Sequence, residues 1–380
     1  MSELADIIGG GTPDTNNPTY WDGSIDWYTP AEMEGQRYAT SSVRKITELG
    51  LQNSSAKMLP AHRTVLFTSR AGIGKMAILQ RPAATNQGFQ SLVLKDGTDP
   101  YFIYSMGEKI KEMAEGVASG STFLEISGKM LGNLEVMAPT LKEQEAIVAL
   151  FRGIDNLITL HQRKYDRLKN VKKSMLEKMF PRDGHDVPEI RFAGFTDAWE
   201  QRKFSELYAK SSEKNDGSIG MDRNITVATM QFKDDVKVST AEYLKTYYTF
   251  NLGDIAFEGH QSKEFRFGRF VENDIGNGIV SHIFTVFRPI TEFDLQFWKY
   301  AINNEMLMQQ ILSRSTKAST MMHDLVIDDF LNETFLVPSL DEQKQIGACL
   351  YSLDHLITLH QRKLEDLQKL KKALLQQMFC

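Results

Sequence analysis

Two long segments of the chain carry apolar residues at a spacing of seven, with polar residues between them. These segments are residues 141–180 and 340–379. A seven-residue spacing places the apolar side chains in one stripe along an α-helix, and such a stripe needs a helical partner to cover it. Five heptads predict helices of about 55 to 60 Å at 1.5 Å per residue. The predicted coiled-coil core consists of Ile147, Ile154, His161, Leu168, Met175, Ile346, Leu353, His360, Leu367 and Leu374.

The two segments are copies of one sequence. Residues 141–180 align without gaps on residues 340–379, at an offset of 199, and 20 of the 40 positions are identical. Residues 157–164 recur unchanged as residues 356–363. In a single chain with such a repeat, a pseudo-two-fold arrangement makes the two helices antiparallel and places the globular regions at opposite ends.

The regions outside the helices share almost no sequence, yet both mix short β-like runs with helical stretches. The predicted strands include residues 65–68, 134–138, 279–287 and 334–337, and the predicted helices include residues 101–113 and 295–311. The predicted fold class is α+β, with two α/β domains separated by two long antiparallel coiled-coil helices in a pseudo-two-fold internal repeat. The predicted boundaries are 1–139 for the first domain, 140–180 for the first helix, 181–199 for a linker, 200–338 for the second domain and 339–380 for the second helix.

The composition fits a folded protein without a metal or a membrane span. The 380 residues suffice for two or three domains, and 42% hydrophobic with 24% charged residues is ordinary. The formal net charge of −5 gives no general attraction to polyanions, so any nucleic-acid contact must come from local basic groups. Cys349 and Cys380 are too few for a disulfide framework or a four-ligand zinc site, so we expect no metal and a reducing, cytoplasmic location. No apolar run approaches the roughly 18 residues of a membrane span.

Near-matches to catalytic motifs each lack a required residue. Residues 70–75 resemble a phosphate-binding loop, but Ser69 and Met76 stand where a glycine and a hydroxyl residue are needed. Residues 17–20 resemble the clamp that holds a flipped base, but Thr19 replaces the second proline and no glycine-rich cofactor motif follows a strand. No histidine belongs to a metal-binding motif, and two of them lie on the core stripes. The sequence therefore predicts no catalytic residue and no bound cofactor.

The repeat carries a recognisable pattern. Each copy reads Pro-x-Leu-x-Glu-Gln-x-x-Ile at its start and Lys-Lys-x-x-Leu-x-x-Met-Phe at its end, after a variable region. The pattern residues are Pro139, Leu141, Glu143, Gln144, Ile147, Lys172, Lys173, Leu176, Met179 and Phe180, then Pro338, Leu340, Glu342, Gln343, Ile346, Lys371, Lys372, Leu375, Met378 and Phe379. This arrangement resembles the DNA-specificity subunit of a type I restriction-modification enzyme over essentially the whole chain. Residues 10–13, 20–23, 25–27, 69–75 and 85–88 are similar to one class of target recognition domain in that family.

The resemblance implies a non-catalytic specificity subunit that binds double-stranded DNA. Each target recognition domain would read one half of a bipartite target, while the helices set the spacer and dock two modification subunits. Those subunits would bind S-adenosylmethionine and methylate adenine, and restriction subunits would add to that complex. The alternative is a coiled-coil assembly protein, or a catalytic methyltransferase, without a specificity role. In one departure, the leader at residues 192–203 has no counterpart before Ser2, so the chain is either a naturally short form or truncated at its N-terminus.

Side-chain chemistry nominates the DNA contacts. Arg and Lys bond guanine or phosphate, whereas Asn and Gln bond adenine. The candidates are Thr12, Ser69, Arg70, Lys75, Asn86 and Gln87 in the first domain and His260, Lys263, Arg266, Arg269, His282 and Lys317 in the second. A structural role in turns explains the first set about as well as DNA binding does. A solvated charged hairpin explains the second set about as well. The nine basic and five acidic residues of segment 141–180 are expected to solvate a helical face.

Overall fold

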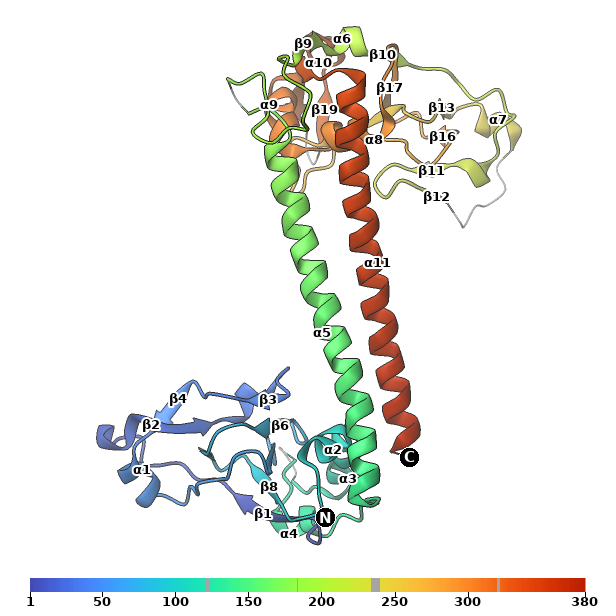
Figure 1. The fold of residues 1–380 in the computed structure, drawn as a ribbon. Helices are drawn as coiled ribbons and strands as arrows, with labels where there is room; N and C mark the ends of the chain where they lie inside the picture. Colours follow the sequence, from blue (N-terminus) through green and yellow to red (C-terminus); the bar gives the residue numbers. More distant parts are fainter. Residues whose placement is uncertain (121–123, 183, 234–239, 320–321, 380) are drawn as a thin grey trace. The chain divides into compact units, whose positions relative to one another are not determined.

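The computed structural model describes residues 1–120, 124–182, 184–233, 240–319 and 322–379 (Figure 1). The chain forms two compact units, unit 1 with Met1–His161 and Lys363–Cys380 and unit 2 with Gln162–Arg362. Two long helices, α5 (Leu141–Lys178) and α11 (Leu340–Met378), contribute to both units. The helices predicted from the seven-residue spacing are therefore confirmed, and each unit combines one globular head with a part of both helices.

The head of unit 1 is built on a five-stranded sheet with strand order β1-β8-β5-β6-β3. Its strands are β1 (Ala5–Gly9), β3 (Tyr38–Ala39), β5 (Thr64–Phe67), β6 (Met76–Leu79) and β8 (Gln90–Leu94). Every residue of β5 and β6 is buried because the sheet is covered on both faces. Val65 and Phe67 face a core shared with α5, whereas Leu66 faces a second core with Tyr28 and Phe89.

A three-stranded sheet and short helices complete this head. The sheet has the order β4-β2-β7, with β2 (Trp21–Tyr28), β4 (Arg44–Ile46) and β7 (Ala83–Thr85). The helices are α1 (Glu48–Gln52), α2 (Pro100–Ser105), α3 (Gly107–Val117) and α4 (Gly128–Gly132), with 3-10 turns at Pro18–Tyr20 and Pro30–Met33. The rings of Trp21 and Trp27 meet edge to face at 5.1 Å, and the Arg44 guanidinium lies 3.7 Å from the Trp21 ring. This sheet therefore has an aromatic core of its own.

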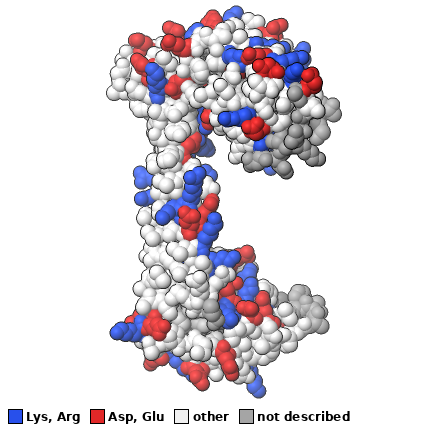
Figure 2. All heavy atoms as spheres, turned by 90° about the vertical axis from the view of Figure 1, so that its right-hand side faces the viewer, with Lys and Arg blue, Asp and Glu red and all other residues white. Residues whose placement is uncertain are grey.

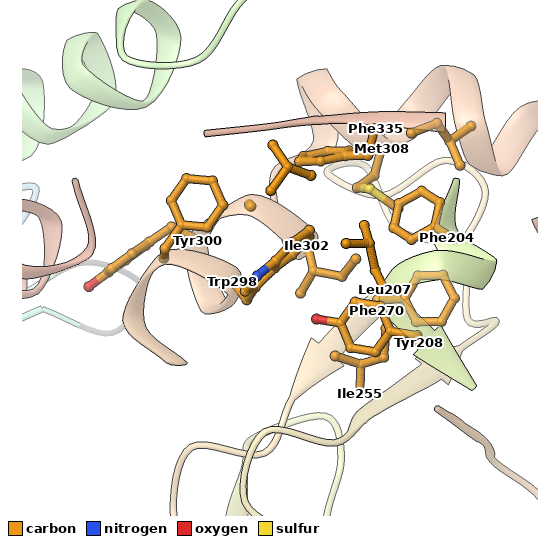
Figure 3. Packing of buried hydrophobic residues seen from close by; sticks show 14 of the residues in the cluster. Phe204, Leu207, Tyr208, Ile255, Phe270, Trp298, Tyr300, Ile302, Met308 and Phe335 are labelled. Atoms are coloured by element: carbon orange, nitrogen blue, oxygen red, sulfur yellow. The ribbon is translucent and has the colours of Figure 1, made fainter. Parts of the chain in front are cut away.

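The head of unit 2 has a main sheet of the same connectivity. Its order is β10-β17-β14-β15, with β10 (Tyr208–Ser211), β14 (Ile255–Glu258), β15 (Arg269–Glu272) and β17 (Thr285–Pro289). Figure 3 shows the aromatic core of this head, where Trp298 packs beside Tyr208 and Phe335 with ring centroids 5.6 and 5.5 Å away. The main sheets of the two heads have the same connectivity although the two sequences differ. The pattern of buried positions specifies a strand, and the identity of the residues at those positions does not.

Smaller sheets and helices surround this core. The two-stranded sheets are β9 (Glu200–Lys203) with β20 (Thr334–Val337), β11 (Ile225–Thr226) with β12 (Gln231–Phe232), β13 (Tyr248–Phe250) with β16 (Gly278–Val280), and β18 (Thr316–Ala318) with β19 (His323–Leu325). The helices are α6 (Phe204–Leu207), α7 (Ala241–Leu244), α8 (Leu295–Ile302), α9 (Glu305–Ser315) and α10 (Ile327–Asn332), with a 3-10 turn at Met221–Arg223.

The predicted coiled-coil positions face inward. Ile154, Ile346 and Leu367 are buried, and the other seven, including His161 and His360, are partly buried. In unit 1 the first half of α5 packs with the end of α11, and in unit 2 the end of α5 packs with the first half of α11. The two helices therefore run antiparallel in each unit, as the repeat predicts.

Two predicted helices are each broken into two. The helix predicted at residues 101–113 is interrupted at Met106, which ends α2 and precedes Gly107 at the start of α3. The helix predicted at residues 295–311 is interrupted because the Asn304 side chain accepts a hydrogen bond from the Met306 amide at 3.1 Å. Asparagine in this role caps a new helix, α9, and does not continue the preceding one.

Two strand predictions also need correction. The single strand predicted at residues 279–287 is two strands, β16 and β17, separated by a turn in which the Phe284 amide donates to the Ser281 carbonyl at 3.1 Å. Residues 134–138 form no strand, although residues 135–138 are the repeat counterpart of β20, which pairs with β9. A strand forms only where a neighbouring strand satisfies its backbone, and no described strand lies beside residues 134–138.

Candidate nucleic-acid interface

A buried carboxylate ties the head of unit 1 to both long helices. Asp155 of α5 is 2% exposed and bonds Lys371 Nζ of α11 at 2.9 Å and Arg37 Nη2 at 2.7 Å. The Tyr101 hydroxyl of α2 donates to the same carboxylate. Burial, and then the hydrogen bond to Asp155, raise the pKa of Tyr101, so its hydroxyl stays protonated as a donor. Because a buried charge is stable only when paired, these contacts fix how the head sits on its helices.

Unit 2 repeats this joint with the roles of the helices exchanged. Asp354 of α11 bonds Lys172 Nζ of α5 at 2.6 Å and accepts a hydrogen bond from the Tyr300 hydroxyl of α8 at 2.7 Å. Asp354 and Lys172 lie 199 residues from Asp155 and Lys371, the offset of the sequence repeat. The aspartate and lysine of the repeat therefore hold each head on the helix pair through the same contact.

A glutamine fixes the start of each long helix against its head. Gln144 accepts a hydrogen bond from the Asp99 amide at 3.0 Å and donates to the carbonyl of the preceding proline at 2.9 Å. Gln343 makes the same two bonds, with the Asp294 amide at 3.2 Å and its own preceding proline at 3.1 Å. Asp99 and Asp294 cap α2 and α8, so the glutamine of the repeated pattern sets the angle between head and helix.

Three loops meet at one edge of the head of unit 1, namely residues 10–12, 68–75 and 85–89. The Gly11 amide donates to the Thr85 carbonyl at 2.9 Å, and the Ser69 amide donates to the Gly88 carbonyl at 2.8 Å. A Cβ on Gly10 would lie 1.9 Å from the Asn86 carbonyl oxygen, so only glycine permits this approach. The loops thereby gather polar side chains from three distant parts of the sequence.

The structure brings three candidate residues of this head together, while two others lie apart from them. Thr12, Asn86 and Gln87 come together, with the Thr12 hydroxyl bonded to the Gln87 side chain. Arg70 is partly exposed and makes no salt bridge within the described part of the chain. Lys75 is tied to Glu34 at 3.0 Å.

Ser69 is a correction to the predicted contacts. It is 0% exposed, and its backbone, not its hydroxyl, joins the neighbouring loops. A side chain without solvent access cannot touch DNA, so we remove Ser69 from the candidate surface.

The counterpart surface of unit 2 uses the corresponding loops. The loop at residues 259–268 connects β14 to β15, as residues 68–75 connect β5 to β6. Ser281 and His282 follow β16 as Asn86 and Gln87 follow β7. The exposed candidates are His260, Lys263, Arg266, His282 and Lys317. Gln261 Nε2 lies 2.8 Å from His323 Nδ1, which links this loop to the β18–β19 hairpin that carries Lys317.

Arg269 makes contacts within unit 2 that give it a structural role, and its contact with DNA stays a prediction. Its Nε donates to Glu258 at 2.8 Å and its Nη2 donates to the Ala228 carbonyl at 2.8 Å. The guanidinium also lies 5.1 Å from the Phe265 ring. These contacts hold the base of the 259–268 loop.

Residues of the two near-motifs have local structural partners. Residues 68–75 form a hairpin in which the Thr68 amide donates to the Lys75 carbonyl at 3.0 Å, and a phosphate-binding loop instead leads into a helix. The Asn17 side chain accepts a hydrogen bond from the Thr19 amide at 3.1 Å and so caps the 3-10 turn that follows. Both segments are therefore explained by turn chemistry.

Sequence reasoning missed how the heads are positioned, because it named Gln144 and Gln343 only as residues of the repeated pattern and did not name Asp155 or Asp354. Asp155, Asp354, Gln144 and Gln343 contact no candidate reading loop through the bonds described above, yet they set the orientation of each head. The sequence contains a signal for these residues, because the aspartate and the glutamine each recur at the offset of 199 at a position outside the apolar stripe. An identical polar residue in a repeat indicates a repeated contact.

On the face shown in Figure 2, Lys and Arg are intermixed with Asp and Glu. Among the described residues no cluster of His, Cys, Asp or Glu could hold a metal ion, and no helix there is long and apolar enough to cross a membrane. Cys349 is partly buried, and Cys380 lies outside the described residues.

Two heads with one topology and different loops define a two-headed recognition protein. The model of the type I restriction modification DNA specificity domain matches residues 1–170 and 197–369. The chain therefore belongs to this family, whose members are specificity proteins and not catalytic subunits. It is 25% identical to the MjaIX specificity subunit of Methanocaldococcus jannaschii, over 99% of this chain and 90% of that protein.

Solved structures show the same fold. The type I restriction-modification S subunit from M. genitalium aligns with a TM-score of 0.57 at 15% identity, covering 100% of this chain and 94% of that one. A chain from a study of complex assembly and conformational transition of the type I restriction-modification system aligns with a TM-score of 0.53 at 15% identity, covering 100% and 96%. Identities this low support the fold alone.

Proposed function

We propose that this chain is the DNA-specificity subunit of a type I restriction-modification enzyme, in which each head reads one half of a bipartite target. The observation that carries this proposal is that the two heads repeat one scaffold but differ in their loops. The main sheet and the joints at Asp155 and Asp354 are repeated, whereas the loops at residues 68–75 and 259–268 differ in sequence and length. Since the scaffold is shared, the loops are the parts that can read different bases.

The reading surface of unit 1 is assigned to Thr12, Arg70, Asn86 and Gln87. Asparagine and glutamine side chains pair with adenine, and a free guanidinium pairs with guanine or phosphate. In unit 2 the assigned residues are His260, Lys263, Arg266, His282 and Lys317, with the lysines directed at phosphate. All of these side chains are exposed or partly exposed.

The partners are proposed to be two copies of one modification subunit, which would carry S-adenosylmethionine and methylate adenine. Leu157 and Leu160 in unit 1 are 45% and 46% exposed, and their repeat counterparts Leu356 and Leu359 in unit 2 are 40% and 52% exposed. Exposure to solvent does not explain why these positions are leucine, and the leucines belong to a block that recurs unchanged. Identical exposed leucines on both helices suit two identical partners, and restriction subunits would join that complex in the cytoplasm.

The test is the pattern of methylated adenines in cells that produce the modification subunits with or without this chain. Single-molecule sequencing should find a two-part motif with an unread spacer, and the motif should disappear when the chain is omitted. The variants Leu160→Glu and Leu359→Glu should reduce methylation, while Lys164→Glu, at a polar position of the same block, should not. A motif that persists without the chain would contradict the proposal.

A further inference from the structure

One aliphatic side chain near the reading loops of each unit lies largely in water. Val43 in unit 1 is 86% exposed, and Ile283 in unit 2 is 74% exposed. Among the described residues, Met137 is the only large apolar side chain that is more exposed than these two. Single exposed apolar side chains are common on protein surfaces, so the position of these two in the fold decides whether they have a role.

Val43 lies at the same end of the three-stranded sheet as Asn86. In the order β4-β2-β7, β7 runs parallel to β2 and β4 runs antiparallel to it. The last residue of β2 is opposite the last residue of β7, and its penultimate residue is opposite the first residue of β4. Val43 directly precedes β4 and Asn86 directly follows β7, so the two residues are separated by two strand spacings, or roughly 10 Å.

The backbone around Val43 is held by two carboxylates. The Val43 amide donates to Glu32 Oε1 at 2.7 Å, and the other oxygen of Glu32 accepts a hydrogen bond from the Thr29 amide at 2.7 Å. The preceding Ser42 amide donates at 3.0 Å to Asp26, which is only 5% exposed. The exposed side chain is therefore presented from a fixed backbone, which reduces the conformational freedom that is lost when it binds.

Ile283 has a comparable position in unit 2. It directly follows His282, in the loop between β16 and β17. The Phe284 amide donates to the Ser281 carbonyl at 3.1 Å, and Phe284 packs against the hydrophobic cluster that contains Val280. The loop is thereby fixed on both sides of Ile283, while the Ile283 side chain stays exposed.

The chemistry of valine and isoleucine limits what they can contact on DNA. Neither side chain can form a hydrogen bond with a phosphate or with the polar atoms of a base edge. The C5-methyl group of thymine is the apolar group that base pairs present in the major groove. Removing one methyl group from water is worth about 0.8 kcal/mol, which corresponds to about a fourfold gain in affinity.

We infer that Val43 and Ile283 each contact the C5-methyl group of a thymine in the half-site that their head reads. Each contact distinguishes an A·T pair from a G·C pair at one position of the target. It complements the hydrogen bonds assigned to neighbouring polar residues, such as Asn86 and His282. The inference rests on the proposed function, because it names a further specificity-determining residue on each of the same two reading surfaces.

The test uses the complex of the full chain with its modification subunits and a labelled duplex that carries the mapped methylation motif. In two further duplexes, uracil replaces every thymine of one half-site, which keeps the base pairing and removes only the methyl groups. Fluorescence anisotropy should show binding at least threefold weaker for each uracil duplex. A duplex with a scrambled motif is the control for the proposed function, because equal binding to the mapped and scrambled motifs would contradict that function itself.

Matched variants assign each methyl contact to one side chain. Val43→Ala should bind the thymine duplex and one of the two uracil duplexes equally well, and Ile283→Ala should do the same with the other uracil duplex. Both variants should fold like the native chain, because the truncated side chains are exposed. Val187→Ala and Ile290→Ala, at exposed apolar positions outside the reading loops, should leave both uracil effects unchanged.

Three results would overturn the inference while leaving the proposed function intact. One is a native complex that prefers the mapped motif but binds thymine and uracil duplexes equally. Another is a variant at Val43 or Ile283 that retains both uracil effects of the native complex. The third is a variant that weakens binding to the thymine and uracil duplexes by the same factor, because its side chain would then act on DNA without reading the methyl group.

Discussion

Asp155 and Asp354 hold the same position in the repeat but differ in their contact with water. The side chain of Asp155 is 2% exposed, and that of Asp354 is 35% exposed. Asp155 also has Arg37 as a second cationic partner. A carboxylate removed from water depends wholly on its partners, whereas a partly solvated one is screened.

We predict that Asp155→Asn destabilises unit 1 by about 3 kcal/mol, because it removes a buried charge on which two partly buried cationic groups depend. Asp354→Asn should cost unit 2 only about 1 kcal/mol, since water already screens that pair. Hydrogen exchange of α2 and α8 in the native protein measures the two effects separately. Asp166→Asn, at an exposed position of α5, is the control, and equal losses for the two joint variants would contradict the argument.

Glu272 is a second buried acid, and it has no comparable partner. Neither of its carboxylate oxygens makes a hydrogen bond within the described residues. It lies opposite Ile255 in the sheet, in the place that Ile78 holds opposite Val65 in unit 1. Burial raises the pKa of Glu272 well above its ordinary value, and the nearby Asp274 raises it further.

We predict that Glu272→Gln stabilises unit 2 increasingly as pH rises. A raised pKa in the folded state means that folding favours the protonated form of Glu272. The contribution of Glu272 to the stability of unit 2 is therefore fully present below the unfolded pKa of about 4.3, and it is lost as pH rises toward the folded pKa. The difference between variant and native protein should therefore be small near pH 4 and grow toward pH 8. Hydrogen exchange of β14 and β15 measures it, with Glu264→Gln as the exposed control, and a difference independent of pH would refute the prediction.

At the scale of elements, the sequence predicted the two repeated long helices but missed the breaks within shorter predicted helices and strands. Five heptads of apolar residues specify α5 and α11, because a long stripe leaves no alternative to a helix pair. The break between α8 and α9 depends on one asparagine cap, Asn304, which resembles any polar helix position until its side chain is seen to bond the backbone. Residues 134–138 form no strand because no described strand lies beside them to pair with, and no local sequence pattern reveals this.

The helix pair predicts how the unread spacer is set. We expect that one heptad added to each helix, after Leu168 in α5 and after Ile357 in α11, lengthens the spacer between half-sites while both half-sites stay unchanged. A heptad adds about 10.5 Å at 1.5 Å per residue, which equals roughly three base pairs at 3.4 Å each. Both insertions are needed because antiparallel helices must keep the Lys172–Asp354 and Asp155–Lys371 pairs in register.

Mapping of methylated adenines in cells with the lengthened chain measures the spacer. Insertions of five residues in each helix are the control, because they turn the apolar stripe away and should prevent assembly. An active enzyme with an unchanged spacer would show that the helices do not set the distance.

At the scale of the whole molecule, the division into shared frame and variable heads could be predicted, while the reading surface could be predicted only in part. The repeat at an offset of 199 revealed the frame directly. Thr12, Asn86 and Gln87 are brought together as candidates, whereas Ser69 is buried and Arg269 forms a salt bridge with Glu258. Side-chain type indicates which bonds are possible, whereas exposure and competing partners arise from tertiary contacts that the local sequence does not encode.

The central claim is that each head reads its half of the target independently. The direct measurement replaces residues 200–338 with the corresponding head of another specificity subunit and maps methylated adenines by single-molecule sequencing. Because the joints at Gln343 and Asp354 lie on α11 and remain in place, the new head should be held in the same way, provided that it supplies the tyrosine and the helix cap. The account predicts that one half of the methylated motif changes and the other half stays as it was. A change in both halves, or in neither, would contradict it.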